Sequence, residues 1–517
     1  MRRLLVVIVL LLLPLSAFAE DLYIAQSDAG LIDGSSCANA HSAAWFNTAG
    51  NWGAGAGLIS AGDTAHFCAT ITTGLTAKAD GSAGNPITLL FESGALLSQP
   101  VCSATVGCLN VSGRNYIIVD GGANGVIENS NNGTSPTYAN QAISIGLAAI
   151  PCSHCEIKNL TIQNIYVHLV DLNDTAVSYN QNHSIKFAGS NTTIHHNTFH
   201  DAGWCLYQNW QNGDTAVEIH HNEFYHCSHG WTVAASGVVS ASNFKFYNNH
   251  IHDYSNWDTT SNTYHHDGIH AFGISGAVGD AYDIYNNLFE GACGDHMTGH
   301  IYMQGITGTQ WTNTGTVRIF NNVLHCDSTV FGILRVDIGH GEIYNNTITG
   351  PGSTGVCFDF LKVINGLFKN NAVEGCNTLI SIDSITTIAN PATDFNYNTY
   401  GICTTANCWK WSPVAPFTNN LSTWQSNCAC DGNSSKNANL SLDENWYPLT
   451  GSPVIGAGTD LSSLGISTLN TDKLGQLRQA GSAWGTGAYE FGASRRFAPR
   501  TSLRRAAVEP NLFLVSQ

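Results

Sequence analysis

The middle of the chain repeats one short pattern of apolar and polar positions. Each copy has a residue of high β-propensity, one or two polar residues, an Asn, any residue and then an apolar residue. The Asn that marks each copy is one of seven: Asn197, Asn222, Asn249, Asn287, Asn322, Asn346 and Asn371. Successive marked Asn are separated by 25, 27, 38, 35, 24 and 25 residues, so four spacings equal one unit and two are a unit with an insertion. The pattern predicts structural repeats of about 25 residues.

Each repeat is predicted to consist of short β-strands. Its alternating or β-branched runs are broken by Asn and Gly, and no run keeps a helical period for ten residues. Asn tolerates the left-handed backbone conformation that a tight turn requires. Identical polar turn residues, stacked from repeat to repeat, can share side-chain hydrogen bonds as a ladder. Because a unit of about 25 residues cannot bury its own apolar face, we expect the units to stack with parallel strands side by side.

These phrases resemble the parallel β-helix repeats of the pectate-lyase-like superfamily, and both ends of the chain carry matching features. Leu22-Tyr23-Ile24, the helix-like segment Asn39 to Phe46 and Ala61-Gly62-Asp63-Thr64 resemble the usual N-terminal cap and the start of the first coil. The closing segments that match are Asp394 to Asn398, Gly451 to Gly458, Asp472 to Arg478 and Gly487 to Glu490. The resemblance implies an all-β fold, a right-handed parallel β-helix solenoid with a short N-terminal capping helix and an irregular C-terminal cap. It also implies a carbohydrate substrate, but this scaffold carries several activities and does not select one.

The chain divides into five predicted segments. Residues 1–19 have the form of a signal peptide, with Arg2 and Arg3 before an apolar run and small residues at Ala17 and Ala19. Residues 20–62 are expected to form the N-terminal cap, 63–390 the parallel β-helix and 391–492 the C-terminal capping region. Residues 493–517 carry five Arg without a clear pattern, which predicts a disordered basic tail. Because no later segment is apolar for 18 residues, we expect no membrane span and a secreted or periplasmic protein.

The charge of the chain restricts its partners. Only 11% of the residues are charged and the formal net charge is −17, which becomes −19 when Arg2 and Arg3 leave with the signal peptide. A strongly negative chain argues against nucleic acid and against anionic membranes as partners, and it also disfavours long-range attraction of a polyanion. We expect a monomer that acts on a polysaccharide.

The cysteines indicate disulfides. All 16 Cys lie beyond the predicted signal peptide, and an even number in an exported chain is typical of paired cysteines. Four pairs are close in sequence and favour local disulfides: Cys102 with Cys108, Cys152 with Cys155, Cys403 with Cys408, and Cys428 with Cys430. A metal or redox site at Cys152-Ser153-His154-Cys155 is the alternative, but the second C-x-x-C of a zinc tetrad is lacking.

A functional site is expected where the repeats stop resembling one another. The strand after each turn can be aligned from repeat to repeat, and strand alternation places every second residue outside. The outward series is predicted to be Cys205, Thr232, His270, Tyr302, Arg335, Cys357 and Ser381. A second outward series, two residues further on, is Tyr207, Ala234, Phe272, Gln304, Asp337, Asp359 and Asp383.

Three residues of these series form the centre of the candidate catalytic site. His270, Tyr302 and Arg335 fall on successive strands, which lie about 4.8 Å apart in a sheet. Insertions at 252–266 and 306–315 flank the same strands, and long loops can wall a binding site. The further catalytic candidates are Asp267 and Asp337, and the substrate-binding candidates are Tyr207, Trp257, Tyr264, His265, His266, His300, Gln304 and Asp359. A purely structural ion pair between Arg335 and Asp337 is the alternative.

A metal site is a separate hypothesis for part of this region. His265-His266-Asp267 contains imidazole and carboxylate groups, which are metal ligands, but adjacent strand residues point to opposite faces. No cofactor is expected to be required, and calcium is the candidate ion.

A polysaccharide lyase that acts by β-elimination is the favoured function. Such an enzyme removes the C5 proton of a uronic acid and expels the O4 substituent, so it needs a cation for the carboxylate, a base and an acid. Arg335 can hold the carboxylate by two parallel hydrogen bonds. His270, with an ordinary pKa near about 6.5, can act as the base, and Tyr302 can protonate the leaving oxygen.

Two other functions compete with the lyase. A glycoside hydrolase needs two carboxyl groups, about 5–5.5 Å apart for retention or about 6.5–9.5 Å apart for inversion. Asp267 and Asp337 are the candidates, with Asp295 or Asp359 as substitutes. In a non-catalytic glycan-binding or surface protein, the same polar set only forms hydrogen bonds with sugar.

Overall fold

The computed structural model describes residues 19–492 except 104–105, 131–140, 148–149, 166–181, 210–212, 235–241, 255–264, 273–279, 294–296, 305–314, 328–331, 338 and 385. The expected signal peptide, apart from its last residue, and the expected basic tail lie outside the described residues. So do Trp257, Tyr264 and Asp295 and almost all of the 306–315 insertion.

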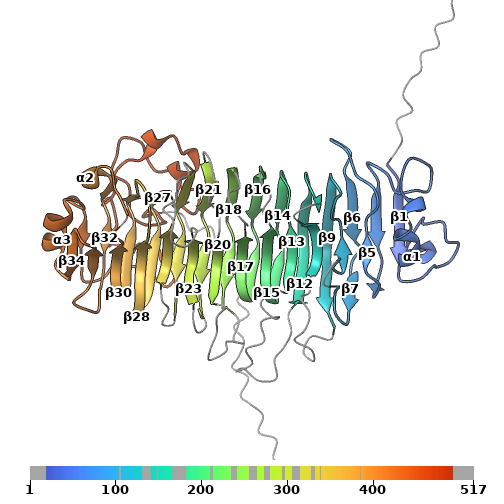
Figure 1. Ribbon diagram of the computed structural model, residues 1–517, viewed down its shortest axis with the longest axis horizontal. Coiled ribbons are helices and arrows are strands. Elements are labelled where there is room, and N and C mark those ends of the chain that lie inside the picture. Colours follow the sequence, from blue (N-terminus) through green and yellow to red (C-terminus); the bar gives the residue numbers. More distant parts are fainter. Residues whose placement is uncertain are drawn as a thin grey trace, which may run out of the picture.

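The described chain winds into a long coil with three walls of parallel strands, so the predicted parallel β-helix is confirmed (Figure 1). The first wall contains, in order, β1 (Asp21–Ala25), β3 (Thr64–Phe67), β6 (Ile87–Phe91), β9 (Ile117–Asn129), β12 (Glu156–Ile165), β14 (Thr192–His195), β16 (Thr215–His220), β18 (Ser242–Tyr247), β21 (Asp280–Tyr285), β24 (Thr316–Phe320), β27 (His340–Tyr344), β29 (Leu367–Lys369) and β31 (Phe395–Asn396).

The second and third walls share several long strands that turn the corner between them. The second wall adds β4 (Thr70–Ile71), β7 (Leu96–Gln99), β15 (Thr198–Asn209), β17 (Glu223–Ala234), β19 (His250–His252), β22 (Leu288–Glu290), β25 (Val323–His325), β28 (Thr347–Phe360), β30 (Ala372–Ile382), β32 (Thr399–Tyr400) and β35 (Ser435–Lys436). The third wall joins the ends of β15, β17, β28 and β30 to β10 (Gln141–Leu147), β13 (His183–Phe187), β20 (His266–Phe272), β23 (Met297–Gln304), β26 (Gly332–Asp337) and β33 (Trp409–Trp411).

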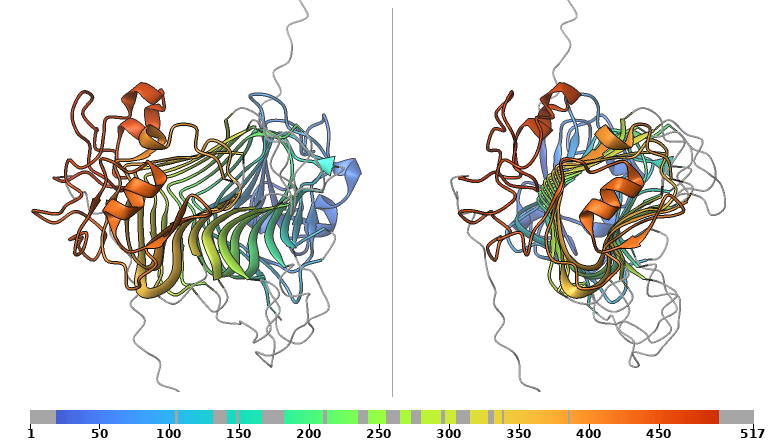
Figure 2. Two further views of the ribbon diagram at one scale, coloured as in Figure 1. Left: turned by 60° about the vertical axis from the view of Figure 1, so that its left-hand side comes forward. Right: turned by 90° about the vertical axis from the view of Figure 1, so that its left-hand side faces the viewer.

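The remaining elements are short and lie mostly at the two ends (Figure 2). Helix α1 (Ala43–Phe46) follows β2 (His41–Ser42) at the N-terminal end, and helices α2 (Pro391–Asp394) and α3 (Leu421–Cys428) lie at the C-terminal end. The other short elements are β5 (Leu75–Thr76), β8 (Leu109–Asn110), β11 (Ile150–Pro151), β34 (Ala415–Thr418), η1 (Cys37–Asn39), η2 (Ala49–Asn51), η4 (Ser462–Leu464) and η5 (Ser467–Asn470). Among the described residues, no helix is long and apolar enough to cross a membrane.

The marked Asn form a continuous hydrogen-bonded ladder at the corner between the first and second walls. The backbone N–H and Nδ2 of Asn197 both donate to Asn222 Oδ1 at 3.0 Å, and the same pair of bonds is repeated from each marked Asn to the next. Asn371 continues the ladder to Asn398, and Asn398 Nδ2 donates to Asp431 Oδ1 at 3.0 Å. All of these Asn are buried, so the ladder satisfies polar groups that water does not reach.

The left-handed backbone conformation falls one residue earlier than the sequence suggests. The residue before each marked Asn has φ between +50° and +58°, and these residues are His196, His221, Asn248, Asn286, Asn321, Asn345 and Asn370. Most of them are Asn, which tolerates this conformation better than other non-glycine residues. The marked Asn itself is free to serve the ladder.

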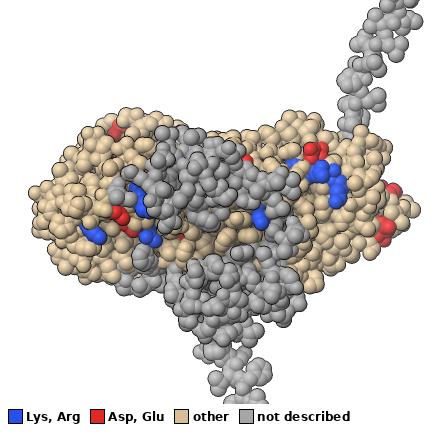
Figure 3. All heavy atoms as spheres, in the orientation of Figure 1, with Lys and Arg blue, Asp and Glu red and all other residues tan. Residues whose placement is uncertain are grey.

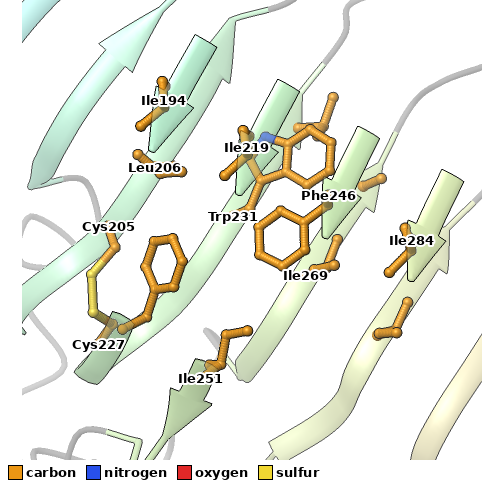
Figure 4. Packing of buried hydrophobic residues seen from close by; sticks show 14 of the residues in the cluster. Ile194, Cys205, Leu206, Ile219, Cys227, Trp231, Phe246, Ile251, Ile269 and Ile284 are labelled. Carbon is orange, nitrogen blue, oxygen red and sulfur yellow. A yellow bond between two sulfur atoms is a disulfide. The ribbon is translucent and has the colours of Figure 1, made fainter. Parts of the chain in front are cut away.

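The interior is filled by columns of apolar side chains from facing walls (Figure 4). Ile194, Ile219 and Phe246 of the first wall face Leu206 and Trp231 of the third wall, and all five side chains are fully buried. The Trp231 and Phe246 rings stack with their centroids 5.4 Å apart. Burial of this surface is the main favourable term for a solenoid whose single lap has no core of its own.

All sixteen Cys are paired in eight disulfides, which confirms the expected disulfide bonding. The four pairs that are close in sequence are joined to each other, including Cys152 with Cys155. The other four disulfides are Cys37–Cys68, Cys205–Cys227, Cys293–Cys326 and Cys357–Cys376. A metal site at the C-x-x-C is therefore not supported, because its two sulfurs are bonded to each other and not available as thiolate ligands.

Candidate functional site

The third wall brings the central site candidates into one column. Strand pairing aligns His270 of β20, Tyr302 of β23, Arg335 of β26 and Asp359 of β28 on successive strands. The residues that precede them, such as Ile269 and Leu334, are fully buried in the core. Alternation along the strands therefore puts the four polar side chains on the outer face.

The four side chains of this column are in contact. The His270 and Tyr302 rings are stacked with centroids 5.2 Å apart and planes 8° apart. The Arg335 guanidinium lies over the Tyr302 ring, with Cζ 4.7 Å from the centroid, and Arg335 Nε is 3.6 Å from Asp359 Oδ2. Ring stacking and a cation over the ring are favourable geometries for such groups. The column is a preformed stack of an imidazole, a phenol, a guanidinium and a carboxyl group.

Arg335 and Asp337 each lie close to an oppositely charged side chain. Arg335 pairs with Asp359 on the next strand, whereas Asp337 Oδ2 is 3.8 Å from Lys362 Nζ. Asp359 also belongs to the column of Arg335 and not to that of Asp337, because Arg335 and Asp359 are directly opposed. Gln304 and Asp337 are aligned with each other in the second outward series, as the sequence predicts.

Two of the predicted outward positions are wrong by a shift of alignment. Leu206 and Phe358, not Trp204 and Val356, align with Trp231 and Leu334 in the interior. Cys205 and Cys357 consequently fall in an inward column, are fully buried and form disulfides. Tyr207 and Asp359 take the outward positions that the sequence assigned to the two Cys.

A second cluster, here called the histidine–aspartate centre, consists of His229, His265, Asp267 and His270. His265 Nδ1 is 2.7 Å from Asp267 Oδ2, His270 Nδ1 is 3.4 Å from it and His229 Nε2 is 3.5 Å from it. Thr298 Oγ1 donates a hydrogen bond to the other oxygen, Asp267 Oδ1. Asp267 is fully buried, so its carboxyl group depends entirely on these neighbours.

The backbone at Gly268 explains why residues of different spacing meet in this centre. A Cβ at Gly268 would lie 2.5 Å from Tyr254 Oη and 2.6 Å from Phe289 Cε1, both in the interior. Gly268 and Ile269 thus both face inward, which leaves Asp267 and His270, three residues apart, together on the outer face. A side chain at position 268 would be incompatible with this packing.

Two predicted substrate-binding residues lie in the interior instead. His266 pairs with Met297, a core residue, and only 2% of its surface is exposed. His300 is fully buried, with Nδ1 3.1 Å from Tyr254 Oη and Nε2 2.8 Å from the His325 carbonyl. Substrate on the outer face cannot reach either ring, and burial lowers the pKa of both to about 3.

The charges in the histidine–aspartate centre are strongly coupled. Burial alone would raise the pKa of Asp267, but the neighbouring His265 and His270 outweigh it and hold this pKa well below its usual range. Burial would lower the pKa of His265, yet the Asp267 charge raises it. Burial lowers the pKa of His270 to about 4 and also lowers that of His229. The Asp267 charge thus favours the protonated form of His265, and His265 in turn favours the ionised form of Asp267.

The column beyond His270 has shifted pKa values as well. Burial raises the pKa of Tyr302, although the Arg335 charge opposes the change. Burial also raises the pKa of Asp359, and again Arg335 opposes it. Arg335 is thus the charge that stabilises the ionised forms of both neighbours.

Aromatic and cationic groups continue the outer face toward the N-terminal end. Lys186 of β13 lies with Nζ 5.5 Å from the centroid of the Tyr207 ring. The His183 ring stacks on Tyr207 at 4.6 Å and contacts the Trp204 ring at 5.5 Å. Charged side chains are otherwise sparse on the face seen in Figure 3, where most described atoms belong to uncharged residues.

Sequence reasoning missed three of these residues. His229 was overlooked because the outward series included only Thr232 from this repeat. His229 lies three residues earlier on the same strand and pairs with Asp267. His183 and Lys186 were overlooked because β13 carries no marked Asn before it. A signal was nevertheless present, because the alternating segment from His183 to Phe187 matches a strand.

Comparisons with known proteins place the fold. No family model matches the chain, and no curated protein matches it in sequence. The structure of XylC in complex with xylose is 11% identical with a TM-score of 0.52, and the match covers 91% of this chain and 98% of that one. The pectate lyase Pel9A is 14% identical with a TM-score of 0.44 over 92% and 97% of the two chains. A mannuronic-acid-specific family 6 polysaccharide lyase from human gut microbiota is 10% identical with a TM-score of 0.42 over 81% and 91%.

Identities this low show a common fold and nothing finer. With its three walls of parallel strands and a fold shared with the XylC structure, the chain is a right-handed parallel β-helix protein.

Proposed function

We propose that this protein is an exported carbohydrate-active enzyme that cleaves a polysaccharide containing uronic acid by β-elimination. The observation that carries the proposal is the outer column in which His270, Tyr302 and Arg335 stack on one another. The Arg335 guanidinium can bind a carboxylate, and the Tyr302 phenol beside it can transfer a proton. The two groups are close enough to act on the same sugar ring. The eight disulfides support export, because such bonds persist in oxidising compartments.

Arg335 is proposed to bind the uronate carboxylate. Neutralising this carboxylate makes the C5 proton more acidic, which is the main electrostatic demand of the reaction. Arg335 is held in place by Asp359 on one side and by the Tyr302 ring on the other. A preformed position reduces the entropy lost when the substrate binds.

Tyr302 is proposed to transfer the proton. The sequence assigned the base to His270, but its Nε2 is 2.9 Å from Gln304 Oε1 and its Nδ1 faces Asp267, so both ring nitrogens are engaged. The Tyr302 phenol is the neighbouring group on the same column. When C5–H and O4 lie on one side of the sugar, the Tyr302 phenolate, which the Arg335 charge favours, takes the C5 proton and then gives that proton to the departing O4, which restores the phenolate. His270 positions the Tyr302 ring by stacking.

Tyr207, Lys186 and Trp204 are proposed as a subsite for neighbouring sugars. The rings of Tyr207 and Trp204 offer apolar faces for the C–H surface of a sugar. Lys186 adds a second cation for an adjacent uronate. This extends the recognition surface along the wall, in the direction in which a polysaccharide would lie.

The hydrolase alternative is weaker because of its carboxyl groups. Asp267 is fully buried among imidazoles, and Asp359 faces Arg335. Asp337, another candidate, lies with Oδ2 3.8 Å from Lys362 Nζ. Each of these carboxyl groups is thus engaged by an imidazole or a cation, which argues against its use as one of the two carboxyl groups that flank a glycosidic bond. The non-catalytic alternative keeps Tyr207 and Arg335 as sugar ligands and predicts binding without product.

Incubation with a panel of uronic-acid polysaccharides tests the proposal. We expect ultraviolet absorbance from the new C4–C5 double bond, and we expect Tyr302→Phe and Arg335→Lys each to lower kcat/KM on the order of 10²-fold, the usual cost of one lost charge-stabilising or proton-transfer group. The matched controls are Tyr285→Phe and Arg318→Lys on the first wall. Tyr285 is 9% exposed, like Tyr302, and Arg318 pairs with Glu342 at 2.9 Å.

The possible results separate the three functions. New reducing ends without absorbance would refute the lyase in favour of the hydrolase, and retained affinity without any product would refute catalysis. Equal activity losses in the first-wall controls would show that the effects come from general destabilisation, and would remove Tyr302 and Arg335 from the site.

A further inference from the structure

Four side chains on the outer face of the third wall converge on one point. Three ring nitrogens, from His229, His265 and His270, lie 2.7–3.5 Å from the single oxygen Asp267 Oδ2. One donor atom of each of the four residues lies within 4.8 Å of a donor atom of every other. Around tetrahedral zinc with bonds of about 2.0–2.1 Å, the ligand atoms are about 3.3–3.4 Å apart. The distances from the imidazole nitrogens of His229 and His270 to Asp267 Oδ2, 3.5 and 3.4 Å, are close to this ligand spacing.

Hydrogen bonds around the centre orient its lone pairs inward. Gln304 Oε1 accepts from His270 Nε2–H at 2.9 Å, which leaves the lone pair on His270 Nδ1, the atom that faces Asp267. Ser228 Oγ lies 3.1 Å from His229 Nδ1, which leaves His229 Nε2 for the centre. Thr298 occupies Asp267 Oδ1 and leaves Oδ2. Supporting hydrogen bonds of this kind are typical of metal-binding histidines and carboxylates.

The same orientation is unfavourable without a cation. With its proton on Nε2, His270 presents an acceptor nitrogen to the Asp267 carboxylate at 3.4 Å. The contact between His265 Nδ1 and Asp267 Oδ2, at 2.7 Å, is the shortest of the three. A divalent cation at the point of convergence would satisfy all of them.

We propose that His229, His265, Asp267 and His270 bind one divalent first-row transition-metal ion. Three imidazole nitrogens and one carboxylate form a donor set that suits zinc and its neighbours. Calcium, the ion considered from the sequence, prefers six to eight oxygen ligands, and magnesium prefers oxygen as well. The proposal concerns metal binding and holds independently of the chemistry proposed for Tyr302 and Arg335.

The ion would tie together successive laps of the coil. His229 lies on β17 and Asp267 and His270 on β20, while the supporting Thr298 and Gln304 lie on β23. Because the His270 ring stacks on Tyr302, the ion would also place positive charge next to the proposed proton-transfer residue. If the lyase proposal holds, this charge would be a second cation close to the uronate, in addition to Arg335.

Zinc titration of the full-length protein, first freed of metal by a chelator, tests the proposal. We expect one tight site per chain by calorimetry, a rise in Tm with zinc, and an intense visible spectrum when Co²⁺ is used in its place. His229→Gln should abolish the tight site, and Gln304→Ala should weaken it about 10–100-fold, the usual effect of losing a supporting hydrogen bond. An excess of calcium should leave zinc bound.

A second histidine group provides the matched control. His195, His196 and His220 also place donor atoms within 4.8 Å of one another, but on the first wall and its turn. His196→Gln should therefore keep the tight zinc site. Absence of a tight site in the wild type, its loss in His196→Gln but not in His229→Gln, or displacement by calcium would each overturn the proposal. If His229→Gln does not fold, the Gln304→Ala affinity and the wild-type Co²⁺ spectrum decide.

Discussion

Replacing Asn322 by Ala removes one rung of the asparagine ladder in the middle of the coil. Asn322 Oδ1 accepts from the Asn287 backbone N–H at 2.9 Å and from Asn287 Nδ2 at 3.0 Å. Its Nδ2 donates to the Ile284 carbonyl at 2.9 Å and to Asn346 Oδ1 at 3.0 Å. Ala leaves the backbone of the turn intact and removes all four bonds.

The expected loss follows from the groups that lose their partners. Asn287 Nδ2 keeps its bond to the Phe246 carbonyl, and Asn346 Oδ1 keeps the Asn322 backbone N–H. The Asn287 backbone N–H loses its acceptor and the Ile284 carbonyl loses a donor, both in a site where Asn287 and Asn322 are fully buried. An unsatisfied buried group costs about 1–3 kcal/mol, so we expect Asn322→Ala to lower the free energy of unfolding by about 3 kcal/mol after local relaxation.

Equilibrium urea unfolding with the disulfides intact, followed by far-ultraviolet circular dichroism, measures this loss. Asn433→Ala is the control, because Asn433 is exposed, and its effect should stay within about 0.5 kcal/mol. A loss below about 1 kcal/mol for Asn322→Ala would refute the reasoning, since it would mean that water or neighbouring groups satisfy the orphaned atoms at little cost.

Two further predictions concern pH and packing. Burial opposes charging of His252, but Asp253 and Glu223 raise its pKa to about 9, so its stabilisation is complete below the unfolded value of about pH 6.5 and is lost as the pH rises through about 9. Between these two pH values the Tm of the wild type should fall more than that of His252→Gln, and equal slopes would contradict this assignment. Gly268→Ala should lower the free energy of unfolding, measured in urea, by about 1–3 kcal/mol, because the added methyl group clashes with the interior. Gly432→Ala is the control and should leave this free energy unchanged, because its methyl group meets nothing within 4 Å. Similar values for the two variants would show that the interior accommodates the added methyl group.

The fold could be predicted because its signal is repeated. Seven copies of one sequence motif fix the number of residues in a lap, so misaligning a single copy does not change the predicted fold. Each buried Asn also needs a hydrogen-bond partner, which the Asn of the next lap provides. The left-handed residue was displaced by one position, since both residues of an Asn-Asn pair suit a turn and only the ladder distinguishes them.

The site was predictable only where one lap follows another without irregularity. His270, Tyr302 and Arg335 were aligned correctly because an apolar residue precedes each of them. The alignment failed at Cys205 and Cys357, where an outward and an inward position cannot be told apart by hydrophobicity, since Cys suits both.

The histidine–aspartate centre shows a different limit. His265 and Asp267 were named from their residue types, but His270 shares the outer face with Asp267 only because Gly268 breaks the alternation of the strand. A period of two residues cannot anticipate two successive inward positions. Geometry of this kind has to be observed.

The asparagine ladder gives the coil an electrical direction. Every rung donates toward the C-terminal end, so the side-chain amide dipoles add head to tail as peptide dipoles do in an α-helix, and each polarises the next. The positive end of this series emerges at Asn398, where the carboxyl group of Asp431 receives it together with Tyr400 Oη and Trp424 Nε1. Whole laps between Asn197 and Asn398 can therefore be inserted or deleted without changing the groups at the two ends of the ladder. Asp431, which accepts the hydrogen bond from the last amide, cannot be replaced by a residue whose side chain only donates.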